Sequence, residues 1–211
     1  MTSFRDYLTD RDIEIIVACL GAAYYDNGGE YYRPEVGNTN LSFAIAAWQS
    51  SIFNFERAFP KIEGVQECVR DGNVFYIKFK SCRVSFFKYH FTTHAHTFRL
   101  HGTSANRAHI VSANEQLMLF SEPLRNLIVI HTGTPEEGLL EVHIGAPVSA
   151  ERTGDGWVWR DQIFNQETDG AYQPSGRPPK VEPFNELEQP EVDVEPMPEA
   201  EEDDDAENRN L

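Results

Sequence analysis

Cysteine is scarce in this chain, and the few cysteines form no recognisable pattern. Cys19, Cys68 and Cys82 are the only three in 211 residues, and no two of them have the short spacing of a metal site. Secreted disulfide frameworks use a denser and even-numbered set of cysteines. The count therefore argues against a protein held together by disulfides.

Long apolar runs and a basic leader are also missing. No stretch approaches the roughly 18 consecutive apolar residues that a membrane-spanning helix requires. Residues 1–14, which read MTSFRDYLTDRDIE, lack the basic and then apolar order of a secretion signal. We therefore expect a cytoplasmic protein without membrane association.

Short catalytic motifs are absent as well. The chain has no glycine-rich phosphate loop, no Gly-x-Ser-x-Gly, no His-Glu-x-x-His and no Cys-x-x-Cys. A metal-dependent nuclease would need an acid two residues before Lys78 or Lys80, where Tyr76 and Lys78 stand instead. These absences favour a non-enzymatic protein.

Acidic residues are plentiful but unevenly placed. The net charge is −16, and residues 181–211 hold thirteen acids against one arginine, a balance of −12 that leaves −4 for the first 180 residues. Residues 166–211 also carry seven of the twelve prolines and few large apolar residues. Such a segment buries too little apolar surface to offset its ordering entropy, so we expect a disordered acidic tail.

The first 165 residues predict an α+β domain, with two N-terminal helices followed by a mostly antiparallel sheet. Thr9 and Asp12 form a capping-box variant before an apolar repeat that ends at residues 27–29. A second helix starts at Thr39 or Asn40 and ends at Pro60. Its predicted buried stripe consists of Leu41, Ala44, Ile45, Trp48, Ile52 and Phe55.

Alternating segments follow Pro60 and indicate strands. The expected strands are residues 65–69, 74–80, 84–91, 126–131, 139–144 and 157–159, with Asp71-Gly72 as a hairpin turn. Residues 112–115 predict the cap of a short helix that runs towards Phe120. Helices followed by a run of strands are typical of the α+β class. The domain division predicted from these patterns is 1–165 for the globular domain and 166–211 for the tail.

Acidic residues are completely absent from Gly72 to Asn114, a span that carries six Lys or Arg and five His. If residues 81–83 form the turn, alternation places Tyr76, Lys78 and Lys80 on one face with Phe86, Lys88 and His90. Phe75, Ile77, Phe79, Phe87, Tyr89 and Phe91 would then form the core face. The predicted polyanion-binding residues are Tyr76, Lys78, Lys80, Arg83, Phe86, Lys88, His90, Arg99 and Arg107.

Four of the histidines crowd into residues 90–101. His90, His94 and His96 share one strand parity, so they could hold Zn or Fe if the strand continued that far. No carboxylate lies nearby in the sequence to orient the imidazoles, so we expect no cofactor and keep this metal site as the alternative. No catalytic residue is assigned.

These features predict a small regulatory or interaction protein whose basic sheet face binds a polyanion. The polyanion is a nucleic acid or an acidic protein partner, and a role as a toxin–antitoxin component or phage-type regulator fits this plan. The acidic segment 181–211 would compete for the same face within the chain. The alternative is an enzyme, either a histidine-dependent ribonuclease or a metal-dependent hydrolase, centred on residues 90–109.

Overall fold

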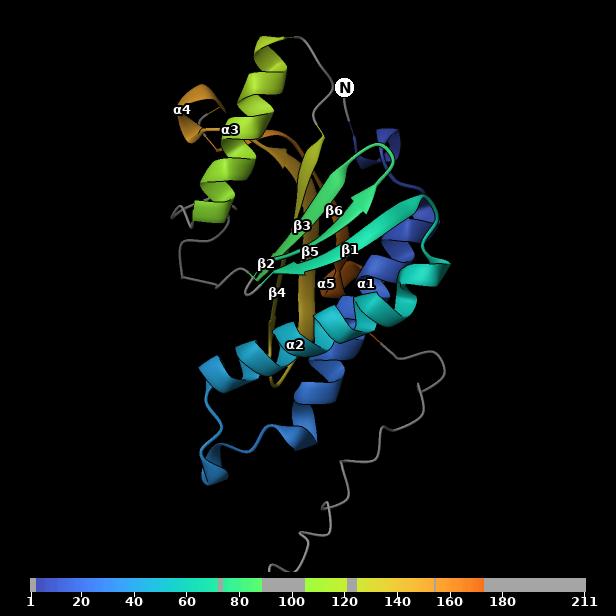
Figure 1. The fold of residues 1–211 in the computed structure, drawn as a ribbon. Coiled ribbons are helices and arrows are strands. Elements are labelled where there is room, and N and C mark those ends of the chain that lie inside the picture. The colour runs from blue at the N-terminus through green and yellow to red at the C-terminus, as the bar shows by residue number, and fades with distance from the viewer. Residues whose placement is uncertain (1–2, 72–73, 89–104, 121–124, 154, 173–211) are drawn as a thin grey trace, which may run out of the picture. The chain divides into compact units, whose positions relative to one another are not determined.

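The computed structural model describes residues 3–71, 74–88, 105–120, 125–153 and 155–172 (Figure 1). Within these ranges the longer helices are α1 (Asp10–Asn27), α2 (Asn40–Ala58) and α3 (Ala105–Leu119). Short helices are η1 (Phe4–Asp6), η2 (Gly29–Tyr31), η3 (Pro34–Val36), η4 (Phe59–Lys61), α4 (Ala150–Thr153) and α5 (Gln166–Asp169). The strands are β1 (Val65–Asp71), β2 (Val74–Phe79), β3 (Arg83–Lys88), β4 (Asn126–Thr134), β5 (Gly138–Pro147) and β6 (Trp157–Asn165).

The six strands form one sheet in sequence order, from β1 at one edge to β6 at the other. All neighbouring strands are antiparallel except β3 and β4, which are parallel. A parallel pair needs a crossover connection, and the segment that contains α3 joins β3 to β4. The predicted α+β class, with helices before a mostly antiparallel sheet, is therefore confirmed.

Both N-terminal helices begin at capping boxes. The Thr9 hydroxyl accepts a hydrogen bond from the backbone N–H of Asp12 at 3.1 Å, and the Asp12 carboxylate accepts one from the Thr9 N–H at 2.9 Å. Thr39 and Ser42 make the same reciprocal pair at the start of α2. Each box satisfies backbone donors that the first helical turn leaves without intrahelical partners.

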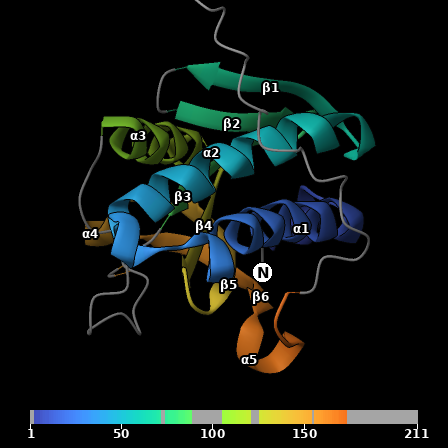
Figure 2. The same cartoon turned by 90° about the horizontal axis from the view of Figure 1, so that it is seen from below.

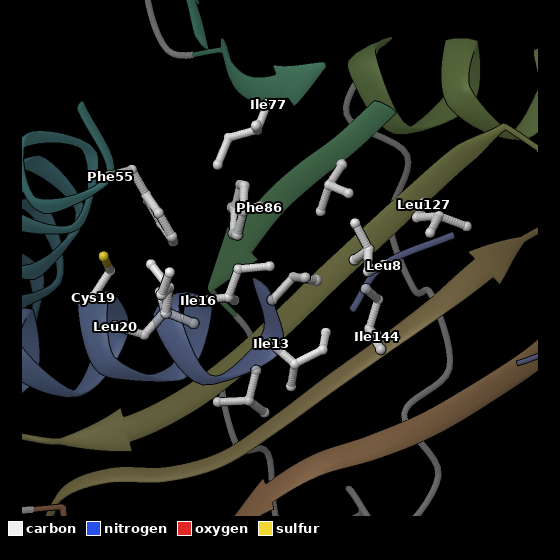
Figure 3. Packing of buried hydrophobic residues seen from close by; sticks show 14 of the residues in the cluster. Leu8, Ile13, Ile16, Cys19, Leu20, Phe55, Ile77, Phe86, Leu127 and Ile144 are labelled. Atoms are coloured by element: carbon white, nitrogen blue, oxygen red, sulfur yellow. The ribbon is translucent and has the colours of Figure 1, made fainter. Parts of the chain in front are cut away.

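One face of the sheet packs against α1 and α2, which lie side by side (Figures 1 and 2). Ile16 and Leu20 of α1 and Phe55 of α2 are fully buried there. Figure 3 shows these side chains meeting Ile77 of β2 and Phe86 of β3. This apolar layer is the main core of the domain.

The opposite face of the sheet packs against α3. Ile110 of α3 joins Ile128 and Ile130 of β4 and Trp157 of β6 in a second buried cluster, with Phe87 at its margin. Because Leu127 and Val129 of the same strand face the main core, β4 is buried on both sides. That explains its continuous apolar sequence.

The helix α3 begins earlier than the sequence predicts. Asn114, which the sequence places in a helix cap, instead lies inside α3 and is fully buried. Its side-chain amide donates to the carbonyl oxygens of Asn126 at 2.8 Å and Pro147 at 2.9 Å, and its oxygen accepts from the Asn126 N–H. The residue therefore ties α3 to two strands.

The buried face of α2 also differs from the predicted stripe. Leu41 is 68% exposed and Ile45 is 50% exposed, whereas Phe43 and Ala47 are buried. The first half of α2 is apolar around most of its circumference, so periodicity alone does not identify the side that faces the sheet.

The fold continues past Asn165, where the sequence predicts that the ordered domain ends. Gln166 to Asp169 form α5, and Tyr172 packs against the main core. Its ring lies so close to Gly21 of α1 that a Cβ atom there would overlap it, so a larger residue at this position would displace the ring. The rest of the predicted tail, residues 173–211, lies outside the described residues.

Replacing Phe86 with alanine tests the assignment of the main core. Phe86 is 2% exposed and its ring centroid lies 4.4 Å from that of Phe55. Phe86→Ala should lower the free energy of unfolding by about 3–5 kcal/mol, because it leaves a cavity in the core. Urea denaturation measures the change. Phe53→Ala, on the exposed side of α2, is the matched control and should cost much less; equal effects would contradict the packing described here.

Candidate functional site: a basic face and its pocket

The register between β2 and β3 decides which basic residues share a surface. Lys78 lies opposite Arg83, and Tyr76 lies opposite Ser85. Residues opposite one another in an antiparallel pair point to the same side of the sheet. Tyr76, Lys78, Arg83 and Ser85 therefore face the same side as α3.

Two of the predicted polyanion-binding residues point to the other side. Phe86 is buried in the main core beside Phe55 and Phe75, as Figure 3 shows for the first pair. Lys88 shares that side of the sheet, and its ammonium nitrogen lies 4.6 Å from the ring centroid of Phe43. The predicted alternation of side chains along β3 is therefore wrong by one residue. The prediction took residues 81–83 as the turn, but the last pair of the two strands is Lys78 and Arg83, so the turn consists of residues 79–82.

Tyr76, Lys78 and Arg83 point to the α3 side of the sheet, and we group them with Lys80 and Arg107 as the basic face. Lys78 and Lys80 are exposed, and Tyr76 and Arg83 are half-buried. Arg107 of α3 joins them from the side, with its guanidinium carbon 4.8 Å from the ring centroid of Phe87. The basic face comprises Tyr76, Lys78, Lys80, Arg83 and Arg107. His90 and Arg99, also predicted here, lie outside the described residues.

Arg83 packs against an aromatic ring of the neighbouring strand. Its guanidinium carbon lies 3.6 Å from the ring centroid of Tyr76, the distance of a cation–π stack. Glu67 lies opposite Lys78 on the edge strand β1. Nevertheless, neither Lys78 nor Arg83 makes an ion pair with any acid in the described part of the chain. Within the described residues, the charges of Lys78 and Arg83 are therefore not neutralised by a direct ion pair.

A small pocket of about 80 Å³ opens beside Arg83, between β2, β3 and α3. Its polar lining residues are Arg83, Ser85 and His109, and its apolar lining includes Phe87 and Ile110. Ser85 is 2% exposed, and its Oγ has no hydrogen-bond partner among the residues that the structure describes. The buried Nε of Arg83 lacks one in the same ranges. The pocket thus gathers polar hydrogens that no described group accepts.

Sequence reasoning missed Ser85 and His109 as site residues. Ser85 interrupts the apolar run Val84-Ser85-Phe86-Phe87, which is the available signal for a polar group placed inside a strand. His109 lies on α3, a helix that the sequence predicts to begin only near Ser112. Without the start of α3, His109 could not be assigned to this pocket.

A second polar group lies on the main-core side, where β3 and β4 pair. The Tyr24 hydroxyl and His131 Nδ1 are 3.0 Å apart in a buried hydrogen bond, and Lys88 lies opposite His131. Burial lowers the pKa of Lys88 to about 8. Burial, reinforced by the charge of Lys88, lowers the pKa of His131 to about 3, while burial raises the pKa of Tyr24. All three environments favour the uncharged side chain.

The buried imidazole should make stability depend on pH. Between about pH 6.5 and pH 3 the unfolded chain binds a proton at His131 that the folded chain does not. This residue alone should therefore lower the unfolding free energy by up to about 1.4 kcal/mol for each unit of acidification in that window. Urea denaturation of the native chain and of His131→Gln at pH 6 and pH 4 measures this contribution, and the variant should lose less stability than the native chain.

His109→Gln is the matched control, because the His109 side chain is exposed in the folded chain. This variant should show the same loss of stability between pH 6 and pH 4 as the native chain. A loss in His131→Gln equal to that of the native chain would contradict the buried, uncharged state of His131.

The predicted metal alternative falls on residues beyond the described ranges. His90, His94 and His96 all belong to the segment 89–104. Elsewhere in the described chain, no group of three or more His, Cys, Asp or Glu is placed to hold a metal ion. His143 is paired with Glu141 at 3.2 Å, and burial lowers its pKa.

Comparison with known proteins gives no assignment. No protein-family model, curated protein or solved structure matches this chain. Among the helices described, none combines the length and the apolar character needed to cross a bilayer.

Proposed function

We propose that this protein is a small, non-enzymatic regulatory protein that binds a polyanion through the basic face. The observation that carries the proposal is the stack of Arg83 on Tyr76, next to Lys78 and without an acidic partner in the described residues. A guanidinium held flat on a ring keeps its edge donors available for phosphate or carboxylate oxygens.

The sequence adds two supports. No Asp or Glu occurs from Gly72 to Asn114, so the chain segment that carries the basic face contributes no negative charge of its own. The same span adds further cations, including Arg99. A surface of this kind attracts polyanions over a distance set by salt, so its binding should weaken steeply as the ionic strength rises.

Fluorescence anisotropy of labelled single-stranded RNA and duplex DNA, titrated with the full chain at two salt concentrations, tests the proposal. The variant Lys78→Gln/Arg83→Gln should bind at least about tenfold more weakly and depend less on salt, because each lost phosphate contact lowers the salt slope by about 1. Lys61→Gln, which removes an exposed charge in η4, is the matched control and should change affinity less than about twofold.

Equal losses in both variants would show that net charge, and not the basic face, determines binding. Absence of binding to either nucleic acid would remove nucleic acid as the polyanion. An acidic peptide titrated in the same assay would then test the protein partner that the sequence analysis allows.

We also propose that the acidic segment 181–211 competes with the external polyanion. Its charge of −12 is tethered to the same chain, so its effective concentration is high. A chain that ends at Lys180 should therefore bind RNA more tightly than the full chain at low salt. The ratio of the two affinities should be smaller at high salt. Equal affinities would withdraw the regulatory role of the segment without affecting the basic face.

A further inference from the structure

The pocket beside Arg83 has the polar character of an oxyanion site. Ser85 Oγ–H and Arg83 Nε–H are donors, and both lack an acceptor among the described residues. His109 can donate as well, and the lining contributed by the described residues contains no Asp or Glu. An unsatisfied buried hydroxyl costs stability, so an occupant that accepts from Ser85 would relieve a cost that the folded chain otherwise bears.

The size of the pocket restricts the occupant. About 80 Å³ accommodates a few water molecules or one phosphate group, whereas whole small-molecule ligands occupy pockets of several hundred Å³. The apolar walls, formed by residues such as Phe87 and Ile110, strengthen the attraction between the guanidinium and an anion because they exclude water. A single phosphate group on a larger molecule meets both conditions.

The depth of Ser85 distinguishes a terminal phosphate from an internal one. Ser85 is 2% exposed, so a phosphate oxygen that reaches its hydroxyl must enter the pocket. An internal phosphodiester carries a sugar on each side, and both would have to enter with it. A terminal phosphate monoester has one attachment, which can leave through the mouth of the pocket.

We propose that this pocket binds the terminal phosphate of a nucleic-acid strand. The inference rests on the proposed function, since the rest of the strand would lie along the basic face. Lys78 lies directly opposite Arg83 and is exposed, and Lys80, two residues further along the chain, is also exposed. They provide charges for the internal phosphates, while Arg83 and Ser85 bind the end.

The test uses three versions of one RNA sequence: one with a 5′-phosphate, one with a 3′-phosphate and one with hydroxyl groups at both ends. In each version the fluorescent label is attached away from the end that is compared. The full chain should bind one of the two phosphorylated strands at least about tenfold more tightly than the hydroxyl strand. The strand that binds more tightly shows whether the 5′ or the 3′ end enters the pocket. Ser85→Ala should reduce this ratio to below about threefold. Lys78→Gln should weaken all strands and preserve the ratio.

Thermal melting separates a binding role of Ser85 from a structural one. Ser85→Ala removes a buried hydroxyl that has no described partner, so without ligand its melting temperature should equal or exceed that of the native chain. Inorganic phosphate, compared with chloride at matched ionic strength, should raise the melting temperature of the native chain more than that of the variant. A lowered melting temperature without ligand would assign Ser85 a structural role and overturn the proposal.

The other outcomes are also distinguishable. Equal affinity for the phosphorylated and hydroxyl strands would overturn the end-binding pocket and leave the proposed function intact. Failure of every strand to bind would overturn both. Tighter binding of a phosphoserine peptide than of either phosphorylated strand would overturn the nucleic-acid assignment and make the pocket a phosphopeptide site.

Discussion

The pairing of β2 with β3 is the constraint on which the site depends. With Lys78 opposite Arg83, alternation places Val84 and Phe86 in the main core and Arg83 and Ser85 on the side of α3. A shift of one residue would exchange these two sets. The aromatic contact of Phe86 with Phe55 opposes that shift, because it would expose a large buried ring and bury a guanidinium. The packing of the core therefore also determines the chemistry of the opposite surface.

The two faces of the sheet differ in what covers them. On one side α1 and α2 cover it with a large apolar core (Figure 2). On the other side α3 covers Ile128 and Ile130 of β4 but leaves Lys78 exposed. The pocket lies between β2, β3 and α3, with Ile110 of α3 as one wall. Strands beside a packed helix give a rigid setting for charged side chains, since strands fix their direction.

Much of the fold was predictable from local chemistry. The cap at Thr9, the end of the second helix at Pro60 and the alternating strands all depend on neighbouring residues, and each appears in the structure. The misplaced Phe86 and Lys88 depend instead on the number of residues in one turn, which alternation does not determine. Ser85 and His109 line one pocket only because α3 packs on this side of the sheet, and that arrangement is a property of tertiary structure. The candidate site was thus predictable as a charged region but not as a pocket.

Amide chemical-shift mapping by NMR, with the full chain titrated with single-stranded RNA, would locate the binding surface residue by residue. We predict that the largest perturbations fall on Arg83, Ser85 and His109, which line one pocket, and on Tyr76, which stacks on Arg83. Perturbations centred on the exposed side of α2, around Leu41, Ile45 and Phe53, with none at Arg83 or Ser85, would contradict it.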